Sequence, residues 1–81
     1  MNDPKVTCPC CGYKTLNEER SYEICDVCGW EDDEIQFDDP NYRGGANSES
    51  LIEAQKNFLR YHANDEENKY YEKDDTWKPH E

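Results

Sequence analysis

Cys8-Pro9-Cys10-Cys11-Gly12 and Cys25-Asp26-Val27-Cys28-Gly29 are the two stretches that decide the fold, because each contains the pattern C-x-x-C-G. In a C-x-x-C pair on a tight turn, both sulfurs point inward at a distance that one tetrahedral ion bridges. Thirteen residues (12–24) separate the two pairs, which is close to zinc-ribbon spacing. The two pairs therefore predict one metal ion with four ligands, Cys8, Cys11, Cys25 and Cys28.

The residues around the second cysteine of each pair fit such turns. Gly12 and Gly29 follow it directly and reach backbone angles that other residues avoid, which brings N–H groups toward the sulfurs and disperses their charge. Cys10 leaves two interpretations open: a spare thiol at the tip of the turn, or a ligand in place of a neighbour. Symmetry with the second pair favours Cys8 and Cys11 as the ligands.

Four thiolates complete a tetrahedral coordination sphere and leave no position for a reacting water. We therefore expect one structural zinc ion. We expect no enzymatic activity, since the chain has no nucleophile–base pair or phosphate loop at usable spacing. Iron is the less favoured metal, because rubredoxins, which also use two C-x-x-C-G turns, separate them by more than the thirteen residues found here. An iron site would make the chain an electron carrier.

The composition indicates one small acidic domain. With 81 residues, of which 33% are apolar, the chain has a small core and needs a staple such as a metal. Its net charge of −11 disfavours nucleic acid and anionic membranes and favours a basic protein partner. No apolar run of signal-peptide or membrane-spanning length is present, so we expect a cytoplasmic protein whose thiols stay reduced.

We expect a small metal-stabilised α+β fold, with zinc-ribbon or rubredoxin-like knuckles, short antiparallel strands and one C-terminal helix. The single cysteine-rich zinc domain would span residues 1–63, with the knuckles at 6–30, an irregular acidic loop at 31–47 and the helix at 50–62. Within the knuckles, the alternation in Tyr22-Glu23-Ile24 predicts a half-buried strand. The remainder, residues 64–81, is predicted to be a charged, solvated tail, although its aromatic residues Tyr70, Tyr71 and Trp77 leave docking or contact with a partner open.

The helix at 50–62 has a clear start signal. Ser50 and Glu53 form a capping-box pattern, in which each side chain bonds an otherwise unpaired backbone N–H. One face of this helix is expected to cover the knuckles, and its residues are Leu51, Gln55, Phe58, Leu59 and His62.

Several blocks of the sequence match one protein family, in order: Cys8-Pro9-Cys10-Cys11-Gly12-Tyr13, Tyr22-Glu23-Ile24-Cys25, Val27-Cys28, Trp30-Glu31-Asp32-Asp33, Gly44-Gly45-Ala46-Asn47, Ser50-Leu51 and Glu53-Ala54-Gln55-Lys56-Asn57-Phe58. On these residues, the chain resembles the bacterial cysteine-rich CPCC domain family from residue 7 to about residue 61. Asp26 stands where that family usually has proline. The resemblance implies a bacterial, zinc-dependent domain and brings no activity, since the family has no settled function.

The acidic segment is the candidate partner surface. Its carboxylates are not ordered by the D-x-D-x-D-G spacing of a calcium loop, and they belong to Glu31, Asp32, Asp33, Glu34, Asp38 and Asp39. We hypothesise an immunity-type role, in which this face neutralises a basic toxin, such as a nuclease, by fast electrostatic association. The alternatives are the iron electron carrier and a nucleic-acid-associated zinc ribbon. The ribbon is disfavoured because residues 1–30 are already net negative.

Overall fold

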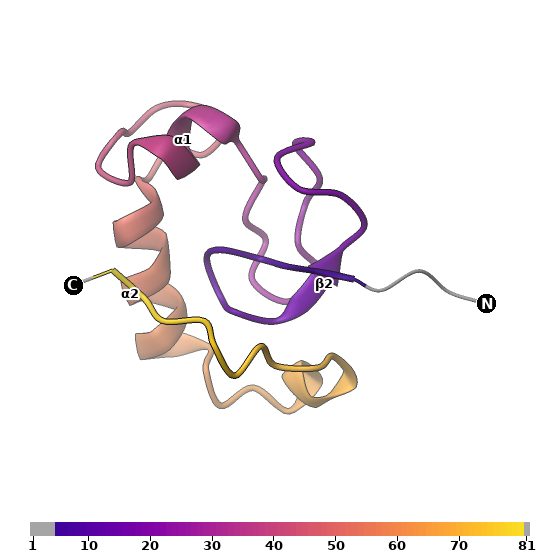
Figure 1. Cartoon of the computed structure of the whole chain (residues 1–81). Coiled ribbons are helices and arrows are strands. Elements are labelled where there is room, and N and C mark those ends of the chain that lie inside the picture. Colours follow the sequence, from indigo (N-terminus) through magenta and orange to yellow (C-terminus); the bar gives the residue numbers. More distant parts are fainter. Residues whose placement is uncertain (1–4, 81) are drawn as a thin grey trace.

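Two short strands flank the first cysteine pair in the computed structural model, which describes residues 5–80 (Figure 1). The elements, in chain order, are β1 (Val6–Thr7), β2 (Lys14–Leu16), α1 (Glu34–Asp38), α2 (Leu51–Tyr61) and the 3-10 helix η1 (Glu66–Tyr70). β1 pairs antiparallel with β2, and the register shifts between Val6 and Thr7. The predicted small α+β fold beside a four-cysteine cluster is confirmed. Residues 1–4, part of the stretch judged to lack a signal segment, and Glu81, the end of the predicted tail, lie outside the described residues.

Helix α2 begins where the capping-box pattern predicts. The Ser50 hydroxyl accepts a hydrogen bond from the Glu53 N–H (3.1 Å), and the Glu53 carboxylate accepts one from the Ser50 N–H (2.9 Å). Both bonds satisfy backbone donors that have no partner inside the helix. The side chains of α2 that are buried are those of Leu51, Gln55 and Phe58.

The other two residues of the predicted face are not buried. Leu59 is 44% exposed, because at about 100° per residue it lies about 80° around the helix from Leu51. His62 caps the helix after its last turn, and its side chain is 59% exposed. Across residues 5–80, no helix has the length and apolar character that a membrane crossing requires.

Gln55 ties α2 to two distant segments of the chain. Its amide nitrogen donates to the Pro9 carbonyl (2.8 Å) within the first cysteine turn, and its amide oxygen accepts from the backbone N–H of His80 (2.8 Å). Gln55 is only 2% exposed. Because a buried polar group without partners destabilises a fold, these two bonds explain why a glutamine occupies the core face of α2.

The predicted irregular backbone at 31–47 is wrong over residues 34–38, which form α1. Asp33 is the N-cap of α1, and its carboxylate accepts from the N–H groups of Ile35 (2.7 Å) and Gln36 (3.2 Å). Gln36 is fully buried and its amide nitrogen donates to the carbonyls of Tyr42, Asn47 and Glu49. The acidic segment therefore has a defined structure, in which the buried Gln36 amide bonds three backbone carbonyls.

The predicted strand at Tyr22-Glu23-Ile24 is also wrong. Tyr22 has a left-handed backbone (φ 63°), and Tyr22 and Ile24 are 47% and 62% exposed. The segment makes one isolated antiparallel bridge, from Ile24 to Glu31. The alternation of apolar and polar residues here marks an exposed turn, because both apolar side chains face solvent.

Residues 64–80 pack against the cysteine-rich part, so the predicted boundary at residue 63 and the solvated tail are wrong. Figure 1 shows this segment (light orange to yellow) running from η1 back past the first cysteine turn to α2. The Asp74 N–H donates to the Gly12 carbonyl (2.8 Å), and the Trp77 indole N–H donates to the Pro9 carbonyl (2.9 Å). The Thr7 hydroxyl donates to the Asp74 carboxylate (2.6 Å). These contacts make residues 64–80 part of the same folded unit.

Replacing Trp77 by alanine tests whether this C-terminal segment stabilises the domain. We expect Trp77→Ala to lower the free energy of unfolding by about 2 kcal/mol, less than for a fully buried tryptophan, because Trp77 is half-buried. Denaturant unfolding measures the loss. Tyr70→Ala is the matched control, since Tyr70 is 79% exposed and should change stability by less than about 0.5 kcal/mol. Equal stability of the two variants would show that the segment is not docked.

Candidate metal centre

The sulfur atoms of Cys8, Cys11, Cys25 and Cys28 all lie within 4.8 Å of one another. The Cys8 and Cys28 sulfurs are 3.6 Å apart, and the Cys11 and Cys25 sulfurs are 3.7 Å apart. A tetrahedron with metal–sulfur bonds of about 2.3 Å places its sulfurs about 3.8 Å apart. A disulfide would need about 2.05 Å, and all of these cysteines are free. The spacing is therefore that of ligands around one shared ion.

Two turns of the same construction present these sulfurs, and we call residues 8–13 the first knuckle and residues 25–30 the second. In each knuckle the first cysteine donates its N–H to the carbonyl five residues on, and its carbonyl accepts from the glycine N–H four residues on. All four bonds are 2.9 Å: Cys8 to Tyr13, Gly12 to Cys8, Cys25 to Trp30 and Gly29 to Cys25. Both glycines have φ 81°, a left-handed conformation that glycine adopts without strain. The sequence repeat is thus a structural repeat.

The Cys25 sulfur receives more hydrogen bonds than the cysteine pattern predicts. The Thr15 hydroxyl, from β2 beside the first knuckle, donates to it at 3.0 Å. The N–H groups of Val27 and Cys28 point at it from within the second knuckle, at 3.3 Å and 3.5 Å. Donors around a thiolate disperse its charge and stabilise the form that binds metal. Thr15 was not identified from sequence, because nothing local shows that β2 brings it to Cys25.

The four clustered thiols affect one another's pKa in different directions. The pKa of Cys25 is lowered, chiefly because the Cys11 thiol donates to its sulfur. The pKa values of Cys8 and Cys11 are raised, first by hydrogen bonds with the Cys11 and Cys25 sulfurs respectively and also by burial. The pKa of Cys28 is raised, chiefly by the Cys10 thiol beside it. A bound cation would remove these differences, because every coordinating thiol loses its proton.

Burial closes the cluster to solvent on most sides. Cys8 and Cys11 are fully buried and Cys25 is 2% exposed, whereas Cys28 is partly exposed. The apolar side chains that share the core with them are Leu16, Trp30, Leu51 and Phe58. Four converging sulfurs in a mostly buried site fit a tetrahedral metal ion.

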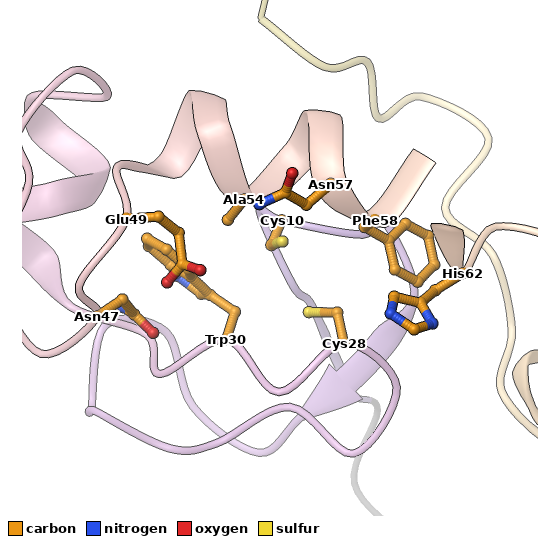
Figure 2. Close-up of a pocket in the computed structure, with 9 residues that line it drawn as sticks. All are labelled: Cys10, Cys28, Trp30, Asn47, Glu49, Ala54, Asn57, Phe58 and His62. Carbon is orange, nitrogen blue, oxygen red and sulfur yellow. The ribbon is translucent and has the colours of Figure 1, made fainter. Parts of the chain in front are cut away.

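Cys10 lies outside the four-sulfur cluster, which decides between its two interpretations. It occupies the first-knuckle position that corresponds to Val27 in the second knuckle. Its side chain is 2% exposed and faces a small cavity that Cys28 also lines (Figure 2). Cys10 is therefore a spare thiol next to the metal ligands.

The acidic residues expected to meet a partner are split between surface and interior. Asp32 and Asp33 are 0% and 4% exposed. Arg20 donates to Asp32 from its backbone N–H (2.6 Å) and its guanidinium (2.9 Å), while Asp33 caps α1 and accepts from the Ala46 N–H (2.9 Å). These two carboxylates are buried and bonded within the chain, which corrects the prediction that they belong to an exposed acidic surface. The others of the set remain at least partly exposed: Glu31, Glu34, Asp38 and Asp39.

Tyr22 stands among these carboxylates, and sequence reasoning placed it in a strand instead. The pKa of its hydroxyl is raised, first by the charge of Asp33 and also by Glu34 and Glu31. Its backbone N–H donates to the Asp32 carbonyl (3.2 Å), which sets the two segments side by side. The sequence does not show this contact between segments ten residues apart, so it did not reveal that Tyr22 lies beside the acidic residues.

Alanine at the two knuckle glycines should have unequal effects. Gly29→Ala meets no atom within 4 Å and should cost about 1 kcal/mol of stability from left-handed backbone strain. Gly12→Ala adds a contact of 2.5 Å with the Trp77 indole and should cost about 1 to 2 kcal/mol more. Denaturant unfolding of both variants, alone and combined with Trp77→Ala, separates the cost of backbone strain from the cost of the contact with Trp77. An excess for Gly12→Ala that persists without Trp77 would contradict this packing.

A comparison with protein families matches residues 6–78 to the family described as "Cysteine-rich CPCC". The match includes the docked residues 64–78, beyond the end near residue 61 that the sequence blocks indicated. No curated protein matches the chain. The two knuckles, the helix that covers them and the C-terminal segment all lie within the matched range, and the chain belongs to the cysteine-rich CPCC family.

Proposed function

We propose that this chain is a zinc-stabilised module that binds a basic protein partner. The closed set of four sulfurs supports a structural role for the metal, since a catalytic ion needs an open position. The knuckle separation of thirteen residues (12–24), shorter than in rubredoxins, supports zinc over iron. A metal confined to the core leaves the surface to carry the function.

The observation that carries the binding proposal is the exposed Tyr22 ring among carboxylates. We define the Tyr22 face as Tyr22, Ile24, Glu31, Glu34 and Ile35. Ile24 and Ile35 are 62% and 58% exposed, and the charges of Glu31 and Glu34 act on the Tyr22 hydroxyl. Exposed aromatic and aliphatic side chains together with nearby carboxylates offer a partner both apolar area and negative charge.

The backbone at Tyr22 supports a role for its side chain. A tyrosine with φ 63° is less stable than glycine or asparagine would be there, by about 1 kcal/mol. The ring is 47% exposed, so packing does not offset this strain. Strained residues that packing does not explain are concentrated at binding sites. We infer that the tyrosine is retained for what it contacts outside the chain.

A lysine or arginine side chain fits the Tyr22 face chemically. Its cation would lie over the ring, an interaction of about 0.5 to 1 kcal/mol at an exposed site, while its N–H groups bond Glu31 or Glu34. The net charge of −11 would accelerate encounter with a basic protein. A toxin that acts on nucleic acid has a cleft lined by lysine and arginine side chains. An immunity-type role, in which this chain binds such a cleft, is therefore the specific form of the function that we propose.

Titration of the metal-loaded protein with a lysine- and arginine-rich peptide, followed by NMR, tests the binding proposal. We expect shift changes centred on the Tyr22 face, with affinity that falls as salt rises. Tyr22→Ala and Glu34→Gln should each weaken binding about two- to fivefold. The matched controls are Tyr70→Ala and Glu67→Gln, two exposed positions of η1, which should not change the affinity.

Two results would contradict the proposal. One is peptide binding that Tyr22→Ala and Tyr70→Ala weaken equally, because this would show general charge attraction. The other is binding of single-stranded DNA at the same salt concentration as the peptide, which would favour a nucleic-acid partner. For the immunity-type form, the protein should inhibit a basic nuclease toxin in a cleavage assay, and Tyr22→Ala should reduce that inhibition.

A further inference from the structure

A cavity of about 190 Å³ lies between the two knuckles and α2. Cys10 of the first knuckle and Cys28 and Trp30 of the second line it, together with Phe58 and His62 at the end of α2 (Figure 2). The volume suits a guest of a few heavy atoms. The cavity thus places a spare thiol and a metal ligand at one common space.

The two sulfurs face each other across this cavity. Figure 2 shows the Cys10 and Cys28 side chains, from opposite knuckles, with their sulfur atoms turned toward the same space. Cys28 is the one ligand that is partly exposed, whereas Cys8, Cys11 and Cys25 are no more than 2% exposed. A small solute that enters the cavity therefore meets Cys28 and Cys10 before any other sulfur.

Trp30, one of the residues that line the cavity, has a buried donor without a partner in the described part of the chain. Trp30 is 3% exposed, and its indole N–H is buried without a hydrogen-bond partner among residues 5–80. Leaving such a group unpaired costs about 1 to 3 kcal/mol. The part of the cavity wall that Trp30 forms therefore contains a donor whose hydrogen bonding is not satisfied by the described residues.

From these observations we propose that Cys10 and Cys28 form an oxidation site for hydrogen peroxide or a small alkyl hydroperoxide. The Cys28 thiolate takes one peroxide oxygen, which forms a sulfenic acid and releases hydroxide or alkoxide. The Cys10 sulfur then attacks the Cys28 sulfur, an S–S bond forms, and the Cys10 proton leaves with the sulfenic oxygen as water. The two sulfurs together lose two electrons, and the peroxide gains them.

Disulfide formation removes one of the four ligands. Cys8, Cys11 and Cys25 alone leave a tetrahedral ion with an open position, so the affinity for metal falls. Because a domain of 81 residues depends on its metal for stability, the disulfide would also loosen the knuckles. Reduction of the disulfide restores the fourth ligand.

The test treats the zinc-loaded chain with hydrogen peroxide at about one equivalent. Zinc release is followed with a chromophoric chelator, and disulfides are mapped by mass spectrometry of non-reduced peptides. We expect a Cys10–Cys28 disulfide, zinc release in step with it, and rebinding of zinc after reduction. Cys10→Ala should release zinc at least about tenfold more slowly, because the other sulfurs near a Cys28 sulfenic acid, those of Cys8, Cys11 and Cys25, are bound to the zinc ion and resolve it poorly.

Two controls keep the outcome decisive. Cys10→Ser preserves side-chain size and should behave as Cys10→Ala does, and both variants should start with one zinc per chain because Cys10 lies outside the four-sulfur cluster. A disulfide that joins Cys28 to Cys8, Cys11 or Cys25, or that joins two of those three, would overturn the proposal. Equal rates of zinc release from the wild-type chain and from either variant would also overturn it.

Discussion

The attraction of four sulfurs for one cation joins two turns that share little other regular structure. β1 and β2 flank the first knuckle, while the second knuckle has only the Ile24–Glu31 bridge beside it. The apolar residues buried around the sulfurs are Leu16, Trp30, Leu51 and Phe58. Structural zinc contributes about 10 to 16 kcal/mol in small zinc domains, as much as the whole stability of many larger folds. The rest of the chain is arranged around this centre.

Because the apolar core is small, buried polar side chains also hold segments of the chain together. Gln55 joins α2 to the first knuckle and to His80, and Gln36 gathers three carbonyls of the acidic segment. Asp32 holds Arg20, whose guanidinium also lies 3.5 Å from the centre of the Phe37 ring. Each of these groups has partners within the chain, so it orders its segment without the cost of an unpaired polar atom. Loop segments whose polar composition suggests exposure to solvent are held in place by these hydrogen bonds.

The features that could be predicted from the sequence are those encoded by a few neighbouring residues. The repeated C-x-x-C-G pattern indicates the two knuckles, and the Ser50–Glu53 pair indicates the start of α2. Each of these signals is complete within a few residues, so no knowledge of the remaining chain is needed to interpret it.

Features that depend on distant partners could not be read in the same way. Trp77 reaches Pro9 across 68 positions, and Thr15 reaches Cys25 across the turn between the knuckles. Charge composition gave the wrong prediction at Asp32 and Asp33, since a buried aspartate that caps a helix or pairs with an arginine looks the same in sequence as one in solvent. The alternation of apolar and polar residues at 22–24 wrongly predicted a strand, because Tyr22 has a left-handed backbone that turns the chain outward.

X-ray absorption at the metal edge, on protein purified without added metal, tests the central claim most directly. The account predicts one zinc ion per chain with four sulfur neighbours at about 2.3 Å and no nitrogen or oxygen neighbour. Iron with four sulfurs would keep the centre but contradict zinc. Fewer than four sulfurs, or a metal-free protein whose cysteines are paired as disulfides, would contradict the four-sulfur centre on which the fold depends.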